Sequence, residues 1–172
     1  MTLAERLQAD LTDAIRARDE LRRDTLRMVL AAAYNAAKSA RRELSDDEVL
    51  GVLVREVKTR RESVDAFRTG GREELARREE AEIAVLSSFL PDTLAEDELR
   101  GMVRAAISDT GATSARDLGR VMGVLAPRTR GRADGRAVSA MVAQELARAD
   151  LGAHAQGHDA PATTGRGTGD AA

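Results

Sequence analysis

The 172-residue sequence contains no cysteine and no tryptophan, and its aromatic residues are one tyrosine and two phenylalanines. The lack of cysteine excludes disulfides, cysteine zinc sites, iron–sulfur clusters and thiol nucleophiles. With so few aromatic residues, a core must be built from Leu, Val, Ile, Met and Ala, and such a core favours packed helices over a β-sandwich. We therefore expect an all-α protein.

Long apolar runs and an excess of one charge are also missing. No segment has the length and hydropathy of a membrane span or a secretory signal, and acidic residues near the N-terminus argue against a transit peptide. We expect a cytoplasmic protein without a membrane partner and, from its abundant arginine and alanine, a bacterial one. The formal net charge is −2, so nucleic-acid binding would need a local basic patch, and we expect no DNA partner.

Apolar residues recur at helical spacing through most of the chain. The pattern predicts four helices at about residues 2–18, 20–42, 46–68 and 72–90, and three shorter helices after Pro91. Ser45 and Glu48 form a capping box before the third helix, and Gly70-Gly71 ends that helix. Pro127 is expected to end the sixth helix.

These patterns divide the chain into parts. We predict an N-terminal four-helix domain at 1–90, a hinge at 91–98, a small three-helix domain at 99–149 and a disordered glycine-rich tail at 150–172. His154 and His158 lie in that tail. Without a helix to align them and without a third ligand, they do not predict a metal site.

No catalytic arrangement emerges from the residues. The sequence has neither a Walker A loop nor a Rossmann glycine pattern, and its serines have no ordered histidine to activate them. Most carboxylates lie beside arginines on polar helix faces, which is typical of solvated ion pairs. We expect no catalytic residue, no metal and no cofactor, and we favour a protein that is not an enzyme by itself.

The most unusual segment follows Pro127, where arginines alternate with small residues. In an extended loop, Arg128, Arg130 and Arg132 would project to one side about 6.6 Å apart. Guanidinium groups at that spacing suit a phosphate backbone, because each can donate two parallel hydrogen bonds. The alternative is a solvated arginine loop that binds nothing.

Neighbouring residues extend this candidate RNA-binding site. Thr129 would add a hydroxyl donor, and Arg120 and Arg136 would support the contact. Asp134 is expected to cap the following helix. Since no aromatic residue accompanies the arginines, the contact would be to the backbone or shape of the RNA and not to its bases.

A second basic set lies on the third predicted helix. It consists of Arg55, Lys58, Arg60 and Arg61, of which Arg55, Lys58 and Arg61 follow one another at three-residue spacing on one face. Nearby acidic residues dilute its charge. Its alternative is an ordinary polar face of a helical bundle.

Four segments together resemble the GatB/YqeY family, specifically the stand-alone YqeY-like proteins, over about residues 1–149. They are TLRMVLAA at 25–32, REVKTRRESVDAF at 55–67, IAVLSSFLPDTLAEDEL at 83–99 and GRVMGVLAPRTRGRADG at 119–135. The last segment is the sharpest match. Its matching residues are Gly119, Val121, Met122, Gly123, Gly131, Ala133, Asp134 and Gly135.

The family is similar to the C-terminal tail of the B subunit of the tRNA-dependent amidotransferase, which amidates Glu-tRNA(Gln) or Asp-tRNA(Asn). The resemblance implies two helical domains and an accessory protein that binds tRNA or another structured RNA, without the catalytic cradle. It also implies an amidotransferase or an aminoacyl-tRNA synthetase as a partner. The alternatives are a protein-interaction module that docks on such an enzyme, or a non-autonomous part of a glutamine-dependent carbon–nitrogen ligase.

Overall fold

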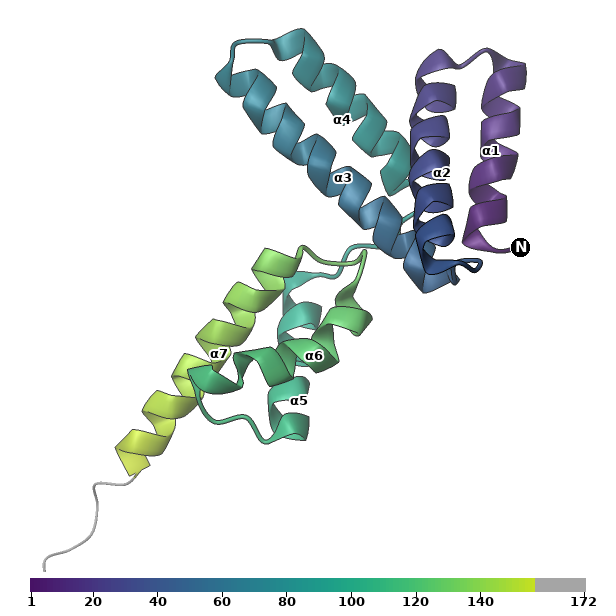
Figure 1. Ribbon diagram of the computed structural model, residues 1–172. Helices are drawn as coiled ribbons and strands as arrows, with labels where there is room; N and C mark the ends of the chain where they lie inside the picture. Colours follow the sequence, from purple (N-terminus) through teal and green to yellow (C-terminus); the bar gives the residue numbers. More distant parts are fainter. Residues whose placement is uncertain (157–172) are drawn as a thin grey trace, which may run out of the picture. The chain divides into compact units, whose positions relative to one another are not determined.

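The computed structural model describes the backbone of residues 1–156 and the side chains of residues 1–150. Over this part of the chain the fold is all-α, as predicted, and contains no strand. The helices, shown in Figure 1, are α1 (Leu3–Ala17), α2 (Glu20–Ala40), α3 (Asp46–Thr69), α4 (Glu73–Ser87), α5 (Glu96–Thr110), the 3-10 helix η1 (Ala115–Asp117), α6 (Leu118–Thr129) and α7 (Gly135–Gln156).

The chain forms two compact units. The first contains Met1–Ala95 together with Arg128–Gly135. The second contains Glu96–Pro127 and α7 from Arg136 onward. The sequence prediction assigned residues 128–135 to the C-terminal helices, whereas the structure groups them with α1 to α4. The arginine-rich segment after Pro127 therefore belongs to the first unit.

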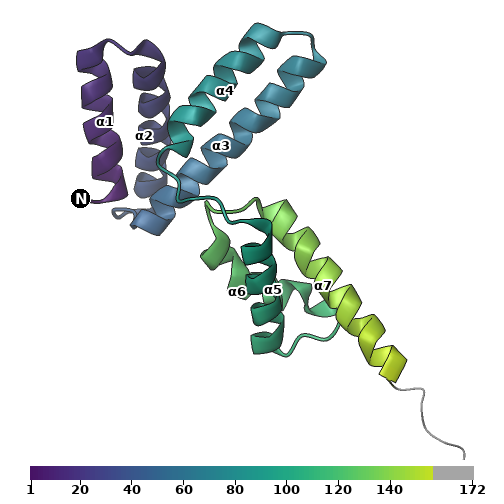
Figure 2. The ribbon, with the colours of Figure 1, turned by 180° about the vertical axis from the view of Figure 1, so that it is seen from behind.

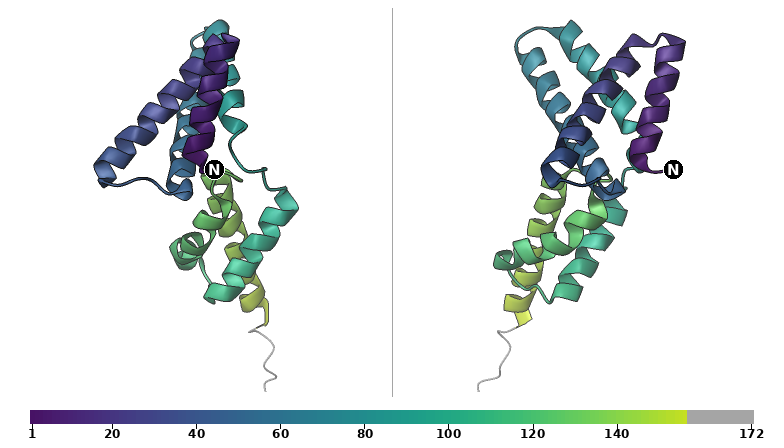
Figure 3. Two further views of the ribbon diagram at one scale, coloured as in Figure 1. Left: turned by 90° about the vertical axis from the view of Figure 1, so that its right-hand side faces the viewer. Right: turned by 45° about the vertical axis from the view of Figure 1, so that its right-hand side comes forward.

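In the first unit, α1 pairs with α2 and α3 pairs with α4, and α2 also contacts α3 and α4. The two helical hairpins meet near one end and diverge toward the other, as Figures 1, 2 and 3 show. Each helix contributes a fully buried leucine to the shared core, and burial of one such side chain stabilises the fold by about 1.5–3 kcal/mol. These leucines are Leu7, Leu26, Leu53 and Leu86.

Short polar residues fix where the helices of the first unit begin. The Ser45 hydroxyl accepts a hydrogen bond from the backbone N–H of Glu48, and the Glu48 carboxylate accepts one from the backbone N–H of Ser45, which confirms the predicted capping box. Thr2 and Glu5 form the same arrangement at the start of α1. Such caps satisfy backbone donors that the helix itself leaves without acceptors.

Residues with a left-handed backbone conformation lie at the ends of several helices. Gly71, two residues after α3, and Gly111, directly after α5, have φ values of 69° and 61°, as expected for glycine near helix ends. Arg18 and Arg41 hold the same conformation at the ends of α1 and α2, with φ values of 57° and 55°. A side chain at such a position costs about 1–2 kcal/mol that glycine avoids.

Two helix boundaries differ from the sequence prediction. Pro127 does not end α6, which continues to Thr129. A proline in the last turn removes only one backbone hydrogen bond, and the residues that follow keep their own acceptors. In addition, α7 continues to Gln156, so residues 150–156, including His154, are helical and not disordered. The remainder of the predicted tail, with His158, lies outside the described residues.

The second unit packs α5, α6 and α7 around their apolar faces. Val103 of α5, Val121 and Leu125 of α6, and Val142 and Leu146 of α7 are fully buried. Within the part of the chain that the structure describes, no helix is both long enough and apolar enough to cross a membrane.

Candidate functional site

Residues 128–135 do not form the extended loop considered from the sequence. Arg128 and Thr129 complete the last turn of α6, and the chain then turns at Gly131, whose φ is 75°. The carbonyl of Thr129 accepts hydrogen bonds from the backbone N–H groups of Arg132 and Ala133, both at 3.0 Å. The arginines therefore do not project in the regular row that an extended strand would give.

This turn is held firmly against the rest of the first unit. The backbone N–H of Leu94 donates to the carbonyl of Arg132 at 2.8 Å, and Nε of Arg132 donates to the carbonyl of Asp92 at 3.3 Å. A Cβ atom at Gly131 would lie 3.2 Å from side-chain atoms of both Leu50 and Pro91. Both the positive φ and this close approach require glycine, so the turn has a defined conformation.

Thr129 was predicted to add a hydroxyl donor to the candidate RNA-binding set, but in the structure this residue is buried, at 4% exposure. The side chain of Arg132 supports the turn, because its Nε donates a hydrogen bond to the carbonyl of Asp92. Arg120 and Arg136 belong to the second unit, where Arg120 pairs with Asp117 at 2.7 Å.

Arg55 and Arg130 line the same open groove, which has a volume of about 480 Å³. Arg55 comes from α3, and Arg130 comes from the turn after α6. The two predicted basic sets, which are distant in the sequence, thus each contribute one arginine to one surface of the first unit. The small and apolar residues that line the groove are Ala36, Ala40, Leu44, Gly51, Val52 and Val54.

Two carboxylates, Asp47 and Glu48, also line this groove. Arg42 binds Glu48 through two hydrogen bonds of 2.7 and 2.8 Å. Chiefly through these bonds, the pKa of Glu48 is lowered to about 2, so it is ionised and matched by Arg42 at neutral pH. Neither Arg55 nor Arg130 forms an ion pair with the described residues, so both guanidinium groups can bind an external anion.

The remaining residues of the second basic set behave differently. Lys58 and Arg61 are exposed on α3, and Lys58 lies 4.0 Å from Glu62. Arg60 was grouped with them in the sequence prediction, but its side chain is only 5% exposed. Arg60 is therefore part of the interior and not of a binding face.

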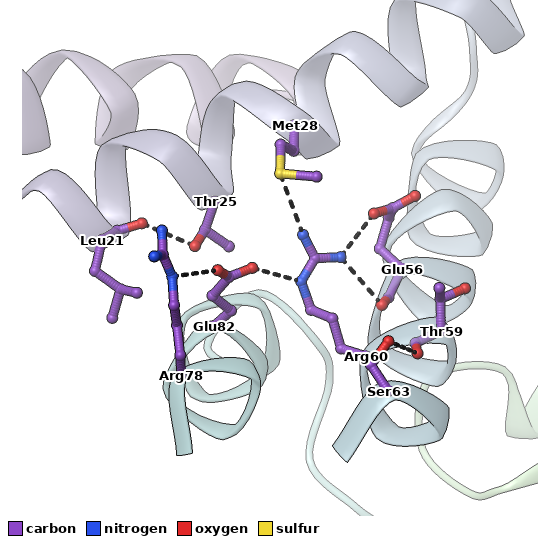
Figure 4. A network of polar contacts seen from close by, with 9 residues as sticks. All are labelled: Leu21, Thr25, Met28, Glu56, Thr59, Arg60, Ser63, Arg78 and Glu82. Carbon is purple, nitrogen blue, oxygen red and sulfur yellow. Dashed lines mark hydrogen bonds and ion pairs between the residues drawn. The ribbon is translucent and has the colours of Figure 1, made fainter. Parts of the chain in front are cut away.

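Figure 4 shows what Arg60 contacts in that interior. Its guanidinium donates to the Glu56 carboxylate at 2.7 Å and to the Glu82 carboxylate of α4 at 3.0 Å. Its third nitrogen faces the sulfur of Met28 on α2 at 3.9 Å. Arg60 thus joins three helices, and its partners satisfy a charge that would be costly to bury alone.

Two glycines of the last family segment, Gly119 and Gly123, lie on an open face of α6. A Cβ atom at Gly119 or Gly123 would meet nothing within 4 Å, so packing of the described residues does not require glycine at either position. Met122, between them, is partly buried. Asp134 directly precedes Gly135, the first residue of α7.

The sequence interpretation overlooked one exposed aromatic residue. Tyr34 on α2 is 69% exposed, so the chain does carry an aromatic ring on a surface that includes cations. The signal was present in the sequence, because Tyr34 falls outside the apolar stripe formed by Leu26, Val29 and Ala33.

The described side chains include no group of three or more His, Asp or Glu residues placed to hold a metal ion. What the structure does present is an all-α protein with two compact helical units and an arginine-lined groove on the first. The chain belongs to the YqeY-like protein family, whose model matches residues 4–146. This match confirms the family predicted from the sequence.

Three fungal proteins are similar to this chain in sequence. The chain is 32% identical over 132 residues to "Altered inheritance of mitochondria protein 41, mitochondrial" of Pyrenophora tritici-repentis, covering 74% of this chain and 71% of the relative. It is 33% identical over 86 residues to an uncharacterized protein of Schizosaccharomyces pombe, covering 50% and 70%. The protein 41 of Eremothecium gossypii is 31% identical over 85 residues, covering 49% and 46%.

The names of two of these relatives refer to mitochondria. The cytoplasmic location and the bacterial origin of this chain stay predictions from its composition.

Proposed function

We propose that this protein is an accessory RNA-binding protein that holds the phosphate backbone of tRNA or another structured RNA, without an active site of its own. The observation that supports it best is the convergence of Arg55 and Arg130 on one groove. In this proposal the protein acts beside an amidotransferase or an aminoacyl-tRNA synthetase, as its resemblance to the amidotransferase tail implies.

The chemistry of the groove suits phosphate. A guanidinium group donates two parallel hydrogen bonds to phosphate oxygens, which gives both strength and orientation. The Arg42–Glu48 pair removes one of the two carboxylate charges that would oppose a phosphate. Arg130 also follows directly on a helix and precedes the fixed turn at Gly131, so little backbone ordering opposes binding.

The test measures binding of purified protein to bulk tRNA across a salt series. The wild type is compared with an Arg55→Gln, Arg130→Gln variant and with a control, Arg16→Gln, Arg77→Gln. The control removes the same charge from arginines that are 75% and 73% exposed elsewhere in the first unit. We expect the groove variant to bind more weakly and to lower the salt slope by roughly 1.4–1.8, while the control retains the wild-type slope.

Equal loss of binding in the groove variant and the control would contradict the groove as the site. No binding of tRNA by the wild type at low salt would contradict the proposal as a whole.

A second candidate function is that of a protein-interaction module, which the apolar residues that line the groove favour. Ala36, Ala40 and Leu44 offer a surface that phosphate does not use. Complex formation with an amidotransferase or synthetase that is insensitive to salt and needs no RNA would favour this function. Turnover of glutamine, ATP and charged tRNA by the purified chain alone would instead identify an enzyme.

A further inference from the structure

The later part of α2 and the residues directly after it carry basic side chains and the chain's only tyrosine. Residues 25–42 contain no acidic residue, although the chain as a whole has more acidic than basic residues. Tyr34 lies in the middle of this segment and is 69% exposed. Arg27, Lys38 and Arg41 lie on the same segment and are exposed as well.

Helical spacing makes Tyr34 and Lys38 neighbours, because four residues separate them on one face of α2. Arg41 directly follows the last residue of α2 and adds a third side chain at the end of that helix. One turn before Tyr34, Ala31 is short and exposed and Leu30 packs against the core, and the Tyr34 side chain is itself exposed to a ligand. The strip formed by Ala31, Tyr34, Lys38 and Arg41 is called the tyrosine strip below.

The cations of the tyrosine strip have no internal task that competes with a ligand. Arg42 pairs with Glu48, but within the described part of the chain neither Lys38 nor Arg41 forms an ion pair. Arg41 also holds a left-handed conformation in which glycine is the usual residue. The chain therefore keeps an exposed cation at a position where a side chain costs stability.

The tyrosine strip is separate from the groove of Arg55 and Arg130. The groove is lined by Ala36 and Ala40 of α2. At about 100° per residue, Ala36 lies roughly 200° around the helix axis from Tyr34. The first unit thus presents two distinct surfaces with unpaired cations.

We propose that the tyrosine strip binds single-stranded RNA, with Tyr34 stacked on an unpaired base and with Lys38 and Arg41 on the adjoining phosphates. This inference rests on the proposed function and adds the class of RNA that is bound: a strand or loop with unstacked bases. An aromatic ring accepts any base through its π-face, and nearby cations follow the backbone. Around Tyr34 the strip has small, polar and cationic residues, not the contiguous apolar area typical of the core of a protein interface.

The intrinsic fluorescence of the chain reports directly on Tyr34. Because the sequence has one tyrosine and no tryptophan, its intrinsic fluorescence comes from Tyr34 alone. The full-length protein is titrated with an oligouridylate of roughly 12 nucleotides and with an RNA duplex of equal length. N-acetyltyrosinamide in the same solutions corrects for light absorbed by the RNA, and a fluorescently labelled oligouridylate reports binding independently by anisotropy.

We expect the single strand to quench Tyr34 fluorescence to saturation and the duplex to leave it nearly unchanged. Tyr34→Ala should weaken oligouridylate binding about 5- to 150-fold, which corresponds to the contribution of one stacked base. Tyr34→Phe should stay within roughly twofold of the wild type, because it retains the ring. Equal binding by Tyr34→Ala and the wild type, without quenching, would overturn the inference.

A matched pair of variants separates the role of the cation from folding. Arg41→Gly and Arg18→Gly each remove one exposed cation from a left-handed position at a helix end. We expect only Arg41→Gly to weaken oligouridylate binding. Equal weakening by both would contradict a specific role for the tyrosine strip.

The outcomes also distinguish this inference from the proposed function. If tRNA binds through Arg55 and Arg130 but the oligouridylate neither quenches Tyr34 nor depends on it, the tyrosine strip is refuted and the proposed function stands. If neither RNA binds at low salt, both are refuted.

Discussion

The guanidinium of Arg60 on α3 donates a 3.0 Å hydrogen bond to the carboxylate of Glu82 on α4. Both side chains are largely buried, at 5% and 14% exposure, and the same guanidinium also binds Glu56. The hairpin of α3 and α4 is therefore joined by a charged contact inside the first unit. Its loss should affect folding and leave the groove of Arg55 and Arg130 without direct change.

We expect Arg60→Ala to lower the free energy of unfolding by about 3–5 kcal/mol, because it leaves two carboxylates without their buried partner. Urea denaturation followed by circular dichroism measures this. Arg77→Ala, at an exposed arginine of α4, should change stability by less than about 0.5 kcal/mol. The double variant Arg60→Met, Glu82→Leu should recover much of the loss, since apolar residues can replace a buried ion pair. A double variant as unstable as Arg60→Ala would contradict this account.

Two glycine substitutions should have opposite effects. Gly131→Ala should destabilise the protein by about 1–2 kcal/mol, because the residue has a positive φ and its new Cβ would press on Leu50 and Pro91. Gly123→Ala should stabilise it by about 0.5–1 kcal/mol, because Gly123 lies in α6 with open space around it. Thermal and urea unfolding of both variants test this, and a destabilising Gly123→Ala would show that the account of α6 is wrong.

Replacing the left-handed arginines should raise stability. Arg18→Gly and Arg41→Gly should each increase the free energy of unfolding by about 1 kcal/mol, because glycine adopts φ values near 57° and 55° without steric cost. Urea unfolding of the two variants measures the gain. A loss at either position would mean that the arginine side chain contributes more contacts than its conformation costs.

Acid should weaken the start of α3 in a defined pH range. The pKa of Glu48 is lowered from 4.5 to about 2 by its hydrogen bonds with Arg42 and Ser45. The folded state therefore holds the ionised form, and this stabilisation is fully present above pH 4.5 and is lost as the pH falls toward 2. Stability measured against pH should fall over this range, and the Glu48→Gln variant should lack that component. An identical pH profile for the wild type and Glu48→Gln would contradict the assignment.

Local signals in the sequence were sufficient for the helices and several caps. The capping box of Ser45 and the break at Gly70-Gly71 depend on residues only a few positions apart, which the sequence shows directly. The structure confirms both predictions. The error at Pro127 has a local cause too: how far a helix continues past a proline depends on the acceptors that remain, and the residue type alone does not determine this.

The inward position of Arg60 was also readable, although it was not used. Arg60 is three residues after Val57 and four before Val64, which are both buried, so it occupies the apolar stripe of α3. A charged residue in such a stripe predicts a buried ion pair and not a surface patch. The groove itself was not predictable in this way, because Arg55 and Arg130 line the same groove only when the turn at Gly131 packs on Leu50 and Pro91.

A conservative double variant tests how the groove recognises phosphate. In Arg55→Lys, Arg130→Lys the charge is kept but the planar fork is lost. If the arginines bind phosphate through paired hydrogen bonds, tRNA affinity should fall several-fold while the dependence on salt stays that of the wild type, because the number of neutralised phosphates is unchanged. Filter binding across a salt series measures both quantities. Wild-type affinity in the lysine variant would show that the groove supplies charge alone, and a reduced salt slope would show that the lysines no longer reach the phosphates.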